Sequence, residues 1–320
     1  MKLSRVLSLR LLPAILALTP LLAPAQKQGN GGDNKFTYSD ALEGAESHVY
    51  KEIGGVTLKL HAFLPPGHQV TDRRPAIVFF FGGGWTSGAP KQFQQQCAYL
   101  ASRGMVAITA DYRVASRQQV KAVQCVSDAK SAIRWVRANA GKLGVDPQRL
   151  AAGGGSAGGH LAACTGVLTE FDEPGENAAV SSAPNAMVLF NPALVLAPLE
   201  GSGVGDDVEK LAVRLGTEAQ KLSPAHHVRA GAPPTIIVHG IADTPVPFST
   251  AKAFTEAMEK AGNRCELAGT QGAAHGFFNF GRGDGQGFTT TLEGADRFLT
   301  SLGWISGEPA VAAFFKDRLK

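Results

Sequence analysis

The stretch Leu150-Ala151-Ala152-Gly153-Gly154-Gly155-Ser156-Ala157-Gly158-Gly159 decides the fold. Three apolar residues typical of a buried strand run into glycines, and a helical pattern opens at Ala157. Gly154 to Gly158 fits Gly-x-Ser-x-Gly, in which the serine lies at a sharp strand-to-helix turn and its neighbours must be small to avoid collisions. The helix behind the serine would aim backbone N–H groups, and the positive end of its dipole, at a developing oxyanion. We therefore expect Ser156 to be a nucleophile.

The alternative for this stretch is a glycine-rich phosphate-binding turn. Two features argue against that alternative. The lysine of a Walker loop is missing, and no dinucleotide-binding fingerprint with its acidic residue follows the strand.

Short apolar runs alternate with amphipathic helical segments along the rest of the chain. The expected strands cover 56–63, 76–81, 105–110, 150–152, 186–190, 235–238 and 265–268, and the expected helices cover 92–102, 118–139, 247–261, 291–302 and a segment from 157. This alternation predicts an α/β fold with a mainly parallel central sheet and helices on both faces. An irregular insertion at 192–231 is a lid or a surface excursion. The tail 308–320 reads as an amphipathic helix packed on the outside.

The first 25 residues resemble a secretory signal peptide, with a basic start, an apolar run at 11–22 and small residues at 23–25. We expect cleavage near Ala25/Gln26 and a secreted or periplasmic protein with no stable membrane anchor, because the apolar run is too short to span a bilayer. A flexible linker at 26–45 should then lead into a single catalytic domain at 46–320.

Charge and cysteine content limit the partners. The chain has 31 basic and 27 acidic residues, and without Lys2, Arg5 and Arg10 of the leader the balance is 28 against 27, so nothing points to nucleic acid. Cys97, Cys125, Cys164 and Cys265 lack metal-type spacing and allow three pairings in an exported chain. A Cys97–Cys125 bridge and buried free thiols both remain open.

A general base for Ser156 can be chosen among eight histidines. His275 lies in a small-residue loop beyond the last apolar strand, where a mobile loop can carry an imidazole to the serine. His160, one helical turn after the serine, is expected to be structural, and His239 is expected to brace the loop that follows its strand. The adjacent pair His226-His227 has no third ligand at metal-binding spacing, so we expect no metal.

The acid that orients this base is expected to be Asp243, in the turn that leaves the penultimate strand. Its carboxylate would fix the imidazole tautomer and stabilise the imidazolium. Asp284, in a glycine-rich loop past His275, is a weaker rival. Asp111 and Asp128 are expected to tie loops and helices together.

An apolar strand runs into Phe81-Gly82-Gly83-Gly84-Trp85 about 70 residues before the serine. Together with Asp111-Tyr112-Arg113, Gly154 to Gly158, His239-Gly240 with Asp243, and His275-Gly276-Phe277, this loop resembles the α/β-hydrolase superfamily. The resemblance is to hormone-sensitive-lipase-like esterases and secreted acetyl-esterase-like, carbohydrate-esterase enzymes, over residues 50–302. It implies the α/β-hydrolase fold, the chain order Ser156, Asp243, His275, and oxyanion donors at the amides of Gly83, Gly84 and Ala157. Phe81 replaces the histidine usual before the three glycines, which removes no backbone donor.

These residues predict a serine ester hydrolase that works through an acyl-enzyme, without a metal or organic cofactor. The segment before the first strand is too short and polar for the helical cap of many relatives, and an open pocket suits a small acyl group such as acetyl on a carbohydrate or other alcohol. Three alternatives remain: a prolyl-oligopeptidase-like peptidase, a lipase or arylesterase of broad specificity, and a hydrolase-fold binding protein. The sequence does not predict the oligomeric state.

Overall fold

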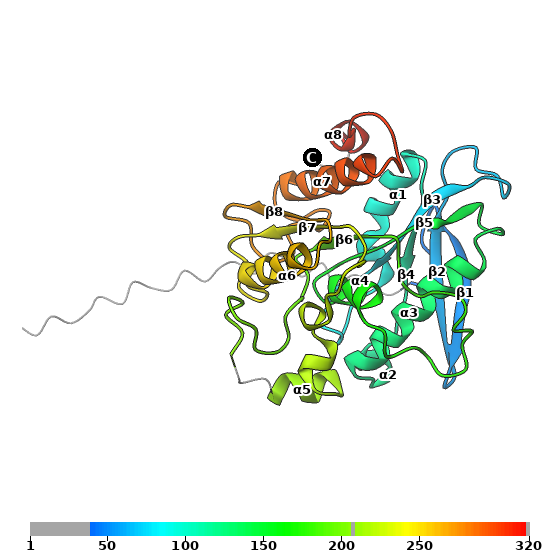
Figure 1. Ribbon diagram of the computed structural model, residues 1–320. Helices are drawn as coiled ribbons and strands as arrows, with labels where there is room; N and C mark the ends of the chain where they lie inside the picture. The colour runs from blue at the N-terminus through cyan, green and yellow to red at the C-terminus, as the bar shows by residue number, and fades with distance from the viewer. Residues whose placement is uncertain (1–38, 206–208, 318–320) are drawn as a thin grey trace, which may run out of the picture. The chain divides into compact units, whose positions relative to one another are not determined.

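The computed structural model describes residues 39–205 and 209–317 and contains an eight-stranded sheet in the order β1-β2-β4-β3-β5-β6-β7-β8 (Figure 1). Strand β2 pairs antiparallel with β1 and β4, and all other neighbours are parallel. This confirms the mainly parallel sheet. The strands are β1 Glu46–Ile53, β2 Val56–Phe63, β3 Arg74–Phe80, β4 Val106–Ala110, β5 Val145–Gly155, β6 Ala186–Phe190, β7 Thr235–Gly240 and β8 Cys265–Thr270.

Helices cover both faces of the sheet, with α1 and α7 on one side and α3, α4 and α6 on the other (Figure 1). The helices are α1 Gln94–Ser102, α2 Ala115–Gln118, α3 Ala122–Ala138, α4 Ala157–Val167, α5 Glu209–Leu215, α6 Phe248–Lys260, α7 Gln286–Ser301 and α8 Val311–Phe314, with 3₁₀ turns η1 Pro90–Phe93, η2 Ala219–Leu222 and η3 Pro224–His227. No helix in the described ranges is both long and apolar enough to cross a membrane.

The N-terminal boundary needs correction. The predicted signal peptide at 1–25 and residues 26–38 of the predicted linker lie outside the described residues. Leu42, placed in the linker, is only 5% exposed and belongs to the core, so the packed domain begins before residue 46. Strand β1 was missed because its buried side chains do not alternate regularly; a shift of register between Val49 and Lys51 interrupts its pairing with β2.

Two expected helices differ from the structure in more than the position of their end residues. The expected helix 118–139 is divided, because Gln119 has a left-handed backbone (φ 55°) that ends α2 before α3 begins. In the described part of the tail, 308–317, the four-residue α8 replaces the helix expected over 308–320, whose last three residues lie outside the described ranges. Phe315, directly after it, is fully buried against Phe280 and Phe288 of the neighbouring loop and α7.

All four cysteines are buried free thiols, so the bridge between Cys97 and Cys125 is wrong. Cys97 belongs to α1 and Cys125 to α3, on opposite faces of the sheet in Figure 1. A disulfide cannot reach across a packed sheet, because its Cα atoms must lie within about 7 Å.

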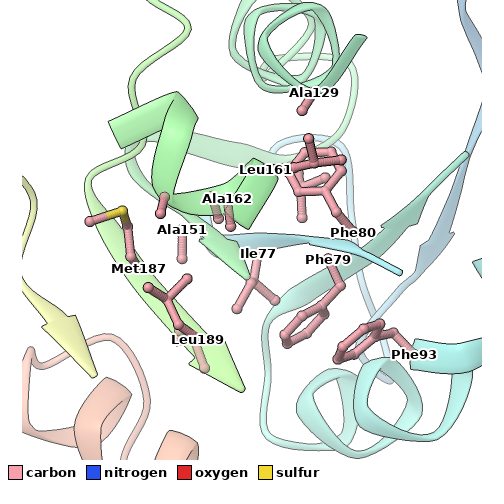
Figure 2. Packing of buried hydrophobic residues seen from close by; sticks show 14 of the residues in the cluster. Ile77, Phe79, Phe80, Phe93, Ala129, Ala151, Leu161, Ala162, Met187 and Leu189 are labelled. Carbon is pink, nitrogen blue, oxygen red and sulfur yellow. The ribbon is translucent and has the colours of Figure 1, made fainter. Parts of the chain in front are cut away.

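The core lies on both faces of the central strand β3 (Figure 2). Phe79 stacks on Phe93 with ring centroids 4.8 Å apart, whereas Phe80 points to the other face, toward Leu161 of α4. Side chains alternate along a strand, and a strand buried on both faces therefore needs a continuous apolar run. This packing fixes the end of β3, where the glycine loop begins.

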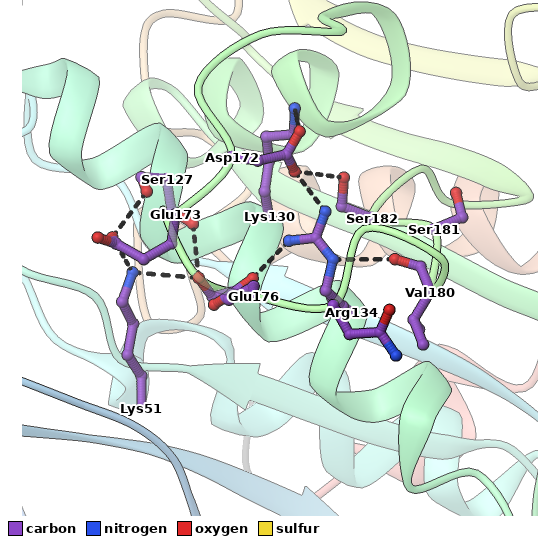
Figure 3. Close-up of polar contacts among 12 residues, drawn as sticks. Lys51, Ser127, Lys130, Arg134, Asp172, Glu173, Glu176, Val180, Ser181 and Ser182 are labelled. Carbon is purple, nitrogen blue, oxygen red and sulfur yellow. Dashed lines mark hydrogen bonds and ion pairs between the residues drawn. The ribbon is translucent and has the colours of Figure 1, made fainter.

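A network of buried charges holds the connection between α4 and β6 against α3 (Figure 3). Lys130, whose side chain is 1% exposed, pairs with Asp172 at 3.1 Å and donates to the carbonyl of Glu170. Arg134 pairs with Asp172 and Glu176, and Lys51 of β1 pairs with Glu173 at 2.6 Å. Each buried cation thus has a carboxylate partner, as burial of a charge requires.

Asp172→Asn should destabilise the protein by about 1–2 kcal/mol near neutral pH, because it removes the anion shared by Lys130 and Arg134. Burial works to raise the pKa of Asp172, but the hydrogen bonds from Arg134 and Lys130 outweigh burial and hold the pKa below its ordinary 3.8. The contribution is therefore complete above pH 3.8 and is lost as the pH falls further. Thermal unfolding should show the gap between wild type and variant narrowing with acidification. A gap that widens toward acid pH would contradict this.

Candidate active site

Ser156 lies between β5 and α4 in a strained conformation, with φ 54° and ψ −121°. Its amide donates to the carbonyl of Phe190 at 2.9 Å, which fixes the turn against β6. A Cβ on Gly158 would lie 2.0 Å from the carbonyl oxygen of Phe80, so only glycine allows α4 to approach β3 this closely. The turn has the geometry expected from Gly-x-Ser-x-Gly.

Three side chains that follow different strands meet at the carboxyl edge of the sheet. Ser156 Oγ lies 3.0 Å from Nε2 of His275, in the loop after β8, and Nδ1 of His275 lies 2.7 Å from Oδ2 of Asp243, in the loop after β7. The carboxylate accepts the Nδ1 proton, which leaves Nε2 as the acceptor for the serine hydroxyl. Asp243 is buried, whereas the His275 side chain is 26% exposed.

Asp243 is surrounded by hydrogen-bond donors. Oδ2 accepts from Asn191 Nδ2 at 2.6 Å as well as from His275, and Oδ1 accepts the amide of Val246 at 2.9 Å. Nε2 of His239 lies 3.3 Å from Oδ2. Burial works to raise the pKa of Asp243, but hydrogen bonds from His239, His275, Asn191 and Val246 hold it well below its ordinary value. The carboxylate therefore stays ionised near neutral pH.

His239 also donates from Nε2 to the carbonyl of Val246 at 2.9 Å, as expected of a residue that braces this loop. Its second role beside Asp243, and the contribution of Asn191, were not expected from the sequence. Asn191 follows β6 with a left-handed backbone (φ 44°), and an asparagine in that position directly after a strand is the one signal that could have drawn attention to it.

The glycine loop after β3 lies beside the serine. Gly83 (φ 123°) and Gly84 (φ 62°) both have positive φ, and a Cβ on Gly83 would lie 2.1 Å from the carbonyl oxygen of Ser87. Within the described residues, no acceptor pairs with the amide N–H of either glycine. Ala157 opens α4, so its N–H is one of the free amides of the first helical turn. The structure thus brings the three predicted donors near Ser156.

A chain of side-chain amides joins this loop to the histidine loop. The amide of Gly82 donates to Gln92 Oε1 at 2.6 Å, and Gln92 Nε2 donates to Asn279 Oδ1 at 2.8 Å. Asn279 Nδ2 then donates to the carbonyl of Gly276, directly after His275, at 2.9 Å. Each donor in this series of hydrogen bonds meets an acceptor in only one orientation of the Gln92 and Asn279 side-chain amides. The series therefore fixes the glycine loop and the histidine loop relative to each other. Sequence reasoning missed Gln92 and Asn279.

A pocket of about 340 Å³ opens onto Ser156 and His275. Its wall is mainly apolar and is completed by residues of the 192–231 insertion, which is therefore no mere surface excursion; the insertion contributes Ala193, Val195, Leu196, Val204, Leu211 and Arg214. Trp85, which also lines the pocket, is fixed by His160, whose Nδ1 accepts from Trp85 Nε1 at 3.2 Å while Nε2 donates to the carbonyl of Leu222 at 2.7 Å. Burial lowers the pKa of His160 to about 4, which keeps the ring neutral.

The remaining candidates lie away from this constellation. Asp284 is exposed and accepts the amide of Gln286, so it is not the partner of His275. Asp111 pairs with Arg117, and Asp128 pairs with Arg113 and Lys51, in the structural roles expected of them. His226 and His227 hydrogen-bond to carbonyl or hydroxyl oxygens. Across the described residues, no group of three or more histidines, cysteines and acids is arranged to hold a metal.

The sheet and this constellation define the class of protein. A serine held at a strand-to-helix turn, within hydrogen-bonding distance of a histidine that is oriented by a carboxylate, is the arrangement of a serine hydrolase. The strand order and the serine, aspartate, histidine sequence are those of the α/β-hydrolase fold.

Comparison with known proteins identifies the family. The BD-FAE family model matches residues 60–258, which are more than half of the chain. The chain therefore belongs to this family, and it is an α/β-hydrolase esterase of the hormone-sensitive-lipase-like kind. Esterase LipC of Mycobacterium tuberculosis is 29% identical over 221 residues, which cover 65% of this chain and 54% of that protein. The chain spans about half the length of the curated relatives that it matches.

Solved structures of esterase 2 from Thermogutta terrifontis are more similar. The form phosphoramylated by tabun is 56% identical with a TM-score of 0.78, and the propionate-bound form is 57% identical with a TM-score of 0.79. Each alignment covers 83% of this chain and 97% of the other. The catalytic domain is therefore a serine carboxylic ester hydrolase.

Proposed function

We propose that the protein hydrolyses esters of small acyl groups, with Ser156 as nucleophile, His275 as general base and Asp243 as its orienting acid. The observation that carries this assignment is the continuous chain of two hydrogen bonds from Ser156 through His275 to Asp243, at 3.0 and 2.7 Å. The organophosphate adduct described for the T. terrifontis esterase supports a reactive serine at the corresponding site.

The proposed reaction has two steps. Ser156 Oγ bonds to the ester carbonyl carbon as its proton passes to Nε2 of His275, and the amides of Gly83, Gly84 and Ala157 donate to the oxyanion. The C–O bond to the alcohol then breaks, with the proton returned from His275 to the leaving oxygen. In the second step, His275 takes a proton from water as the water oxygen bonds to the acyl carbon. The bond to Ser156 Oγ then breaks, His275 returns the proton to Oγ, and the acid is released.

We further propose that the natural acyl group is short, such as acetyl, on a carbohydrate or another alcohol. The propionate-bound and butyrate-bound forms of the T. terrifontis esterase support a short acyl chain. The signal-peptide pattern at 1–25 supports export to the periplasm or the medium. An exported enzyme would have access to acetylated polysaccharides and oligosaccharides.

A series of p-nitrophenyl esters from acetate to octanoate tests the acyl preference, and release of acetate from a panel of acetylated glycans tests the alcohol. We expect kcat/KM to decrease with chain length and acetate to be released from at least one glycan. Preference for octanoate over acetate would contradict the short-acyl assignment.

Gln92→Met should lower kcat about 10- to 100-fold with a smaller change in KM, because small misplacements of a catalytic group have large kinetic effects. The variant removes the bonds that align the Gly82 amide with Asn279 and the His275 loop. Asn279→Ala should act on the same chain, so the double variant should lose less than the product of the two single losses. Gln94→Met is the matched control, because the Gln94 side chain donates to the carbonyl of Glu43 instead. Multiplicative losses would disprove the coupling.

A further inference from the structure

Two arginines, Arg214 of α5 and Arg282 in the loop that follows His275, differ from every other arginine of the described residues. The guanidinium groups of Arg214 and Arg282 have no hydrogen bond or ion pair to another described residue. The others each donate to a carboxylate or a carbonyl, namely Arg73, Arg74, Arg103, Arg113, Arg117, Arg134, Arg137, Arg149, Arg229, Arg264 and Arg297. Within the described residues, the side-chain donors of these two arginines are therefore unused.

Only one of the two guanidinium groups belongs to the described lining of the pocket. Arg214 lines the pocket together with Ser156 and His275. Arg282 covers Gly276, the residue after His275, so closely that a Cβ there would lie 2.7 Å from its Nη1. Asp243 is buried behind His275, and none of the described residues that line the pocket is an aspartate or a glutamate.

Arg214 is held in a way that leaves its donors available. Its Cζ atom lies 5.0 Å from the ring centre of Trp85. A guanidinium group stacked through its face keeps its N–H donors, which lie in the plane of the group, free to bind an anion. Trp85 is itself fixed by His160, so the cation is presented from a rigid support rather than from a free side chain.

We propose that Arg214, with a smaller contribution from Arg282, binds an anionic group of the substrate, so that the preferred esters carry a carboxylate. This inference rests on the proposed function. An acetyl group has no room for a second charge, and the carboxylate must then belong to the alcohol part, as it does in an acetylated glycan that contains uronic acid. The carboxylate fits the fork of N–H donors, and the described lining residues include no acidic side chain that would compete with it.

A matched pair of small acetates tests the charge directly. 4-Carboxyphenyl acetate is anionic at neutral pH, whereas 4-carbamoylphenyl acetate has nearly the same shape and no charge. Dividing each kcat/KM by the rate constant for alkaline hydrolysis corrects for the different leaving groups. The quantity of interest is the corrected ratio of the anionic to the neutral ester, in wild type and in Arg214→Gln, Arg214→Lys and Arg282→Gln.

In wild type the ratio should exceed one and fall with added salt. Arg214→Gln should lower it about tenfold, as expected for a charge-assisted hydrogen bond in a partly exposed site, with smaller losses in Arg214→Lys and Arg282→Gln. Arg297→Gln removes the same charge from the outer face of α7, where Arg297 pairs with Glu293, and should leave the ratio unchanged.

An equal ratio in wild type and Arg214→Gln would overturn the proposal and assign Arg214 to holding α5 over Trp85. If wild type hydrolyses neither acetate and no organophosphate labels it, the proposed function fails, and this inference fails with it. If wild type hydrolyses both acetates at equal corrected rates, the esterase function is supported and only the anion-binding site is disproved. This result therefore distinguishes failure of the inference from failure of the proposed function.

Discussion

Ser156→Ala is expected to lower kcat for an activated acetate ester about a millionfold, with little change in the melting temperature. The variant removes the atom that forms the acyl-enzyme, and the oxyanion donors and the pocket alone retain only a small part of the rate enhancement. Among the described residues, the Ser156 side chain hydrogen-bonds only to His275, at 3.0 Å, while the Ser156 backbone fixes the turn.

Steady-state hydrolysis measured beside thermal unfolding separates this catalytic loss from misfolding. Ser102→Ala is the matched control, because its hydroxyl donates to the carbonyl of Tyr99 within α1. A Ser156→Ala variant that keeps a tenth of the wild-type kcat would show that another group forms the covalent bond.

Asp243→Asn is expected to lower kcat about ten-thousandfold near neutral pH. An amide at this position would offer an N–H to Nδ1 of His275, which then holds its own proton on Nε2 and cannot accept the proton of Ser156. The decrease in kcat comes from the wrong tautomer of His275 and the missing negative charge, because asparagine has nearly the same shape as aspartate.

The rival acid supplies the control for this prediction. Asp284→Asn should keep the wild-type kcat, because Asp284 is exposed and bonds to the amide of Gln286. Full activity in Asp243→Asn together with a large loss in Asp284→Asn would reverse the assignment.

The sequence predicted those parts of the site that depend on local chain geometry. The turn at Ser156 needs small neighbours and a strand-to-helix junction, both visible in the sequence, and Asp243 and His275 follow apolar strands in the expected order. Parallel strands place their carboxyl ends at one edge, so residues that follow different strands can meet there.

Sequence patterns could not predict the residues that align the catalytic histidine and the glycine loop. Gln92 and Asn279 lie 187 residues apart in the chain, and their hydrogen bond depends on how the 3₁₀ turn η1 packs under the histidine loop. Strand β1 was missed for a related reason, since its pairing with β2 tolerates an irregular register. Long-range packing, rather than local propensity, decides such contacts.

Labelling with a fluorophosphonate probe, followed by mass spectrometry of the intact protein and its peptides, tests the central claim most directly. We expect one adduct per chain, located on the peptide that contains Ser156, formed in step with the loss of esterase activity and strongly slowed in His275→Ala. An inactivated enzyme whose adduct lies on another residue, or a fully active enzyme with Ser156 labelled, would contradict it.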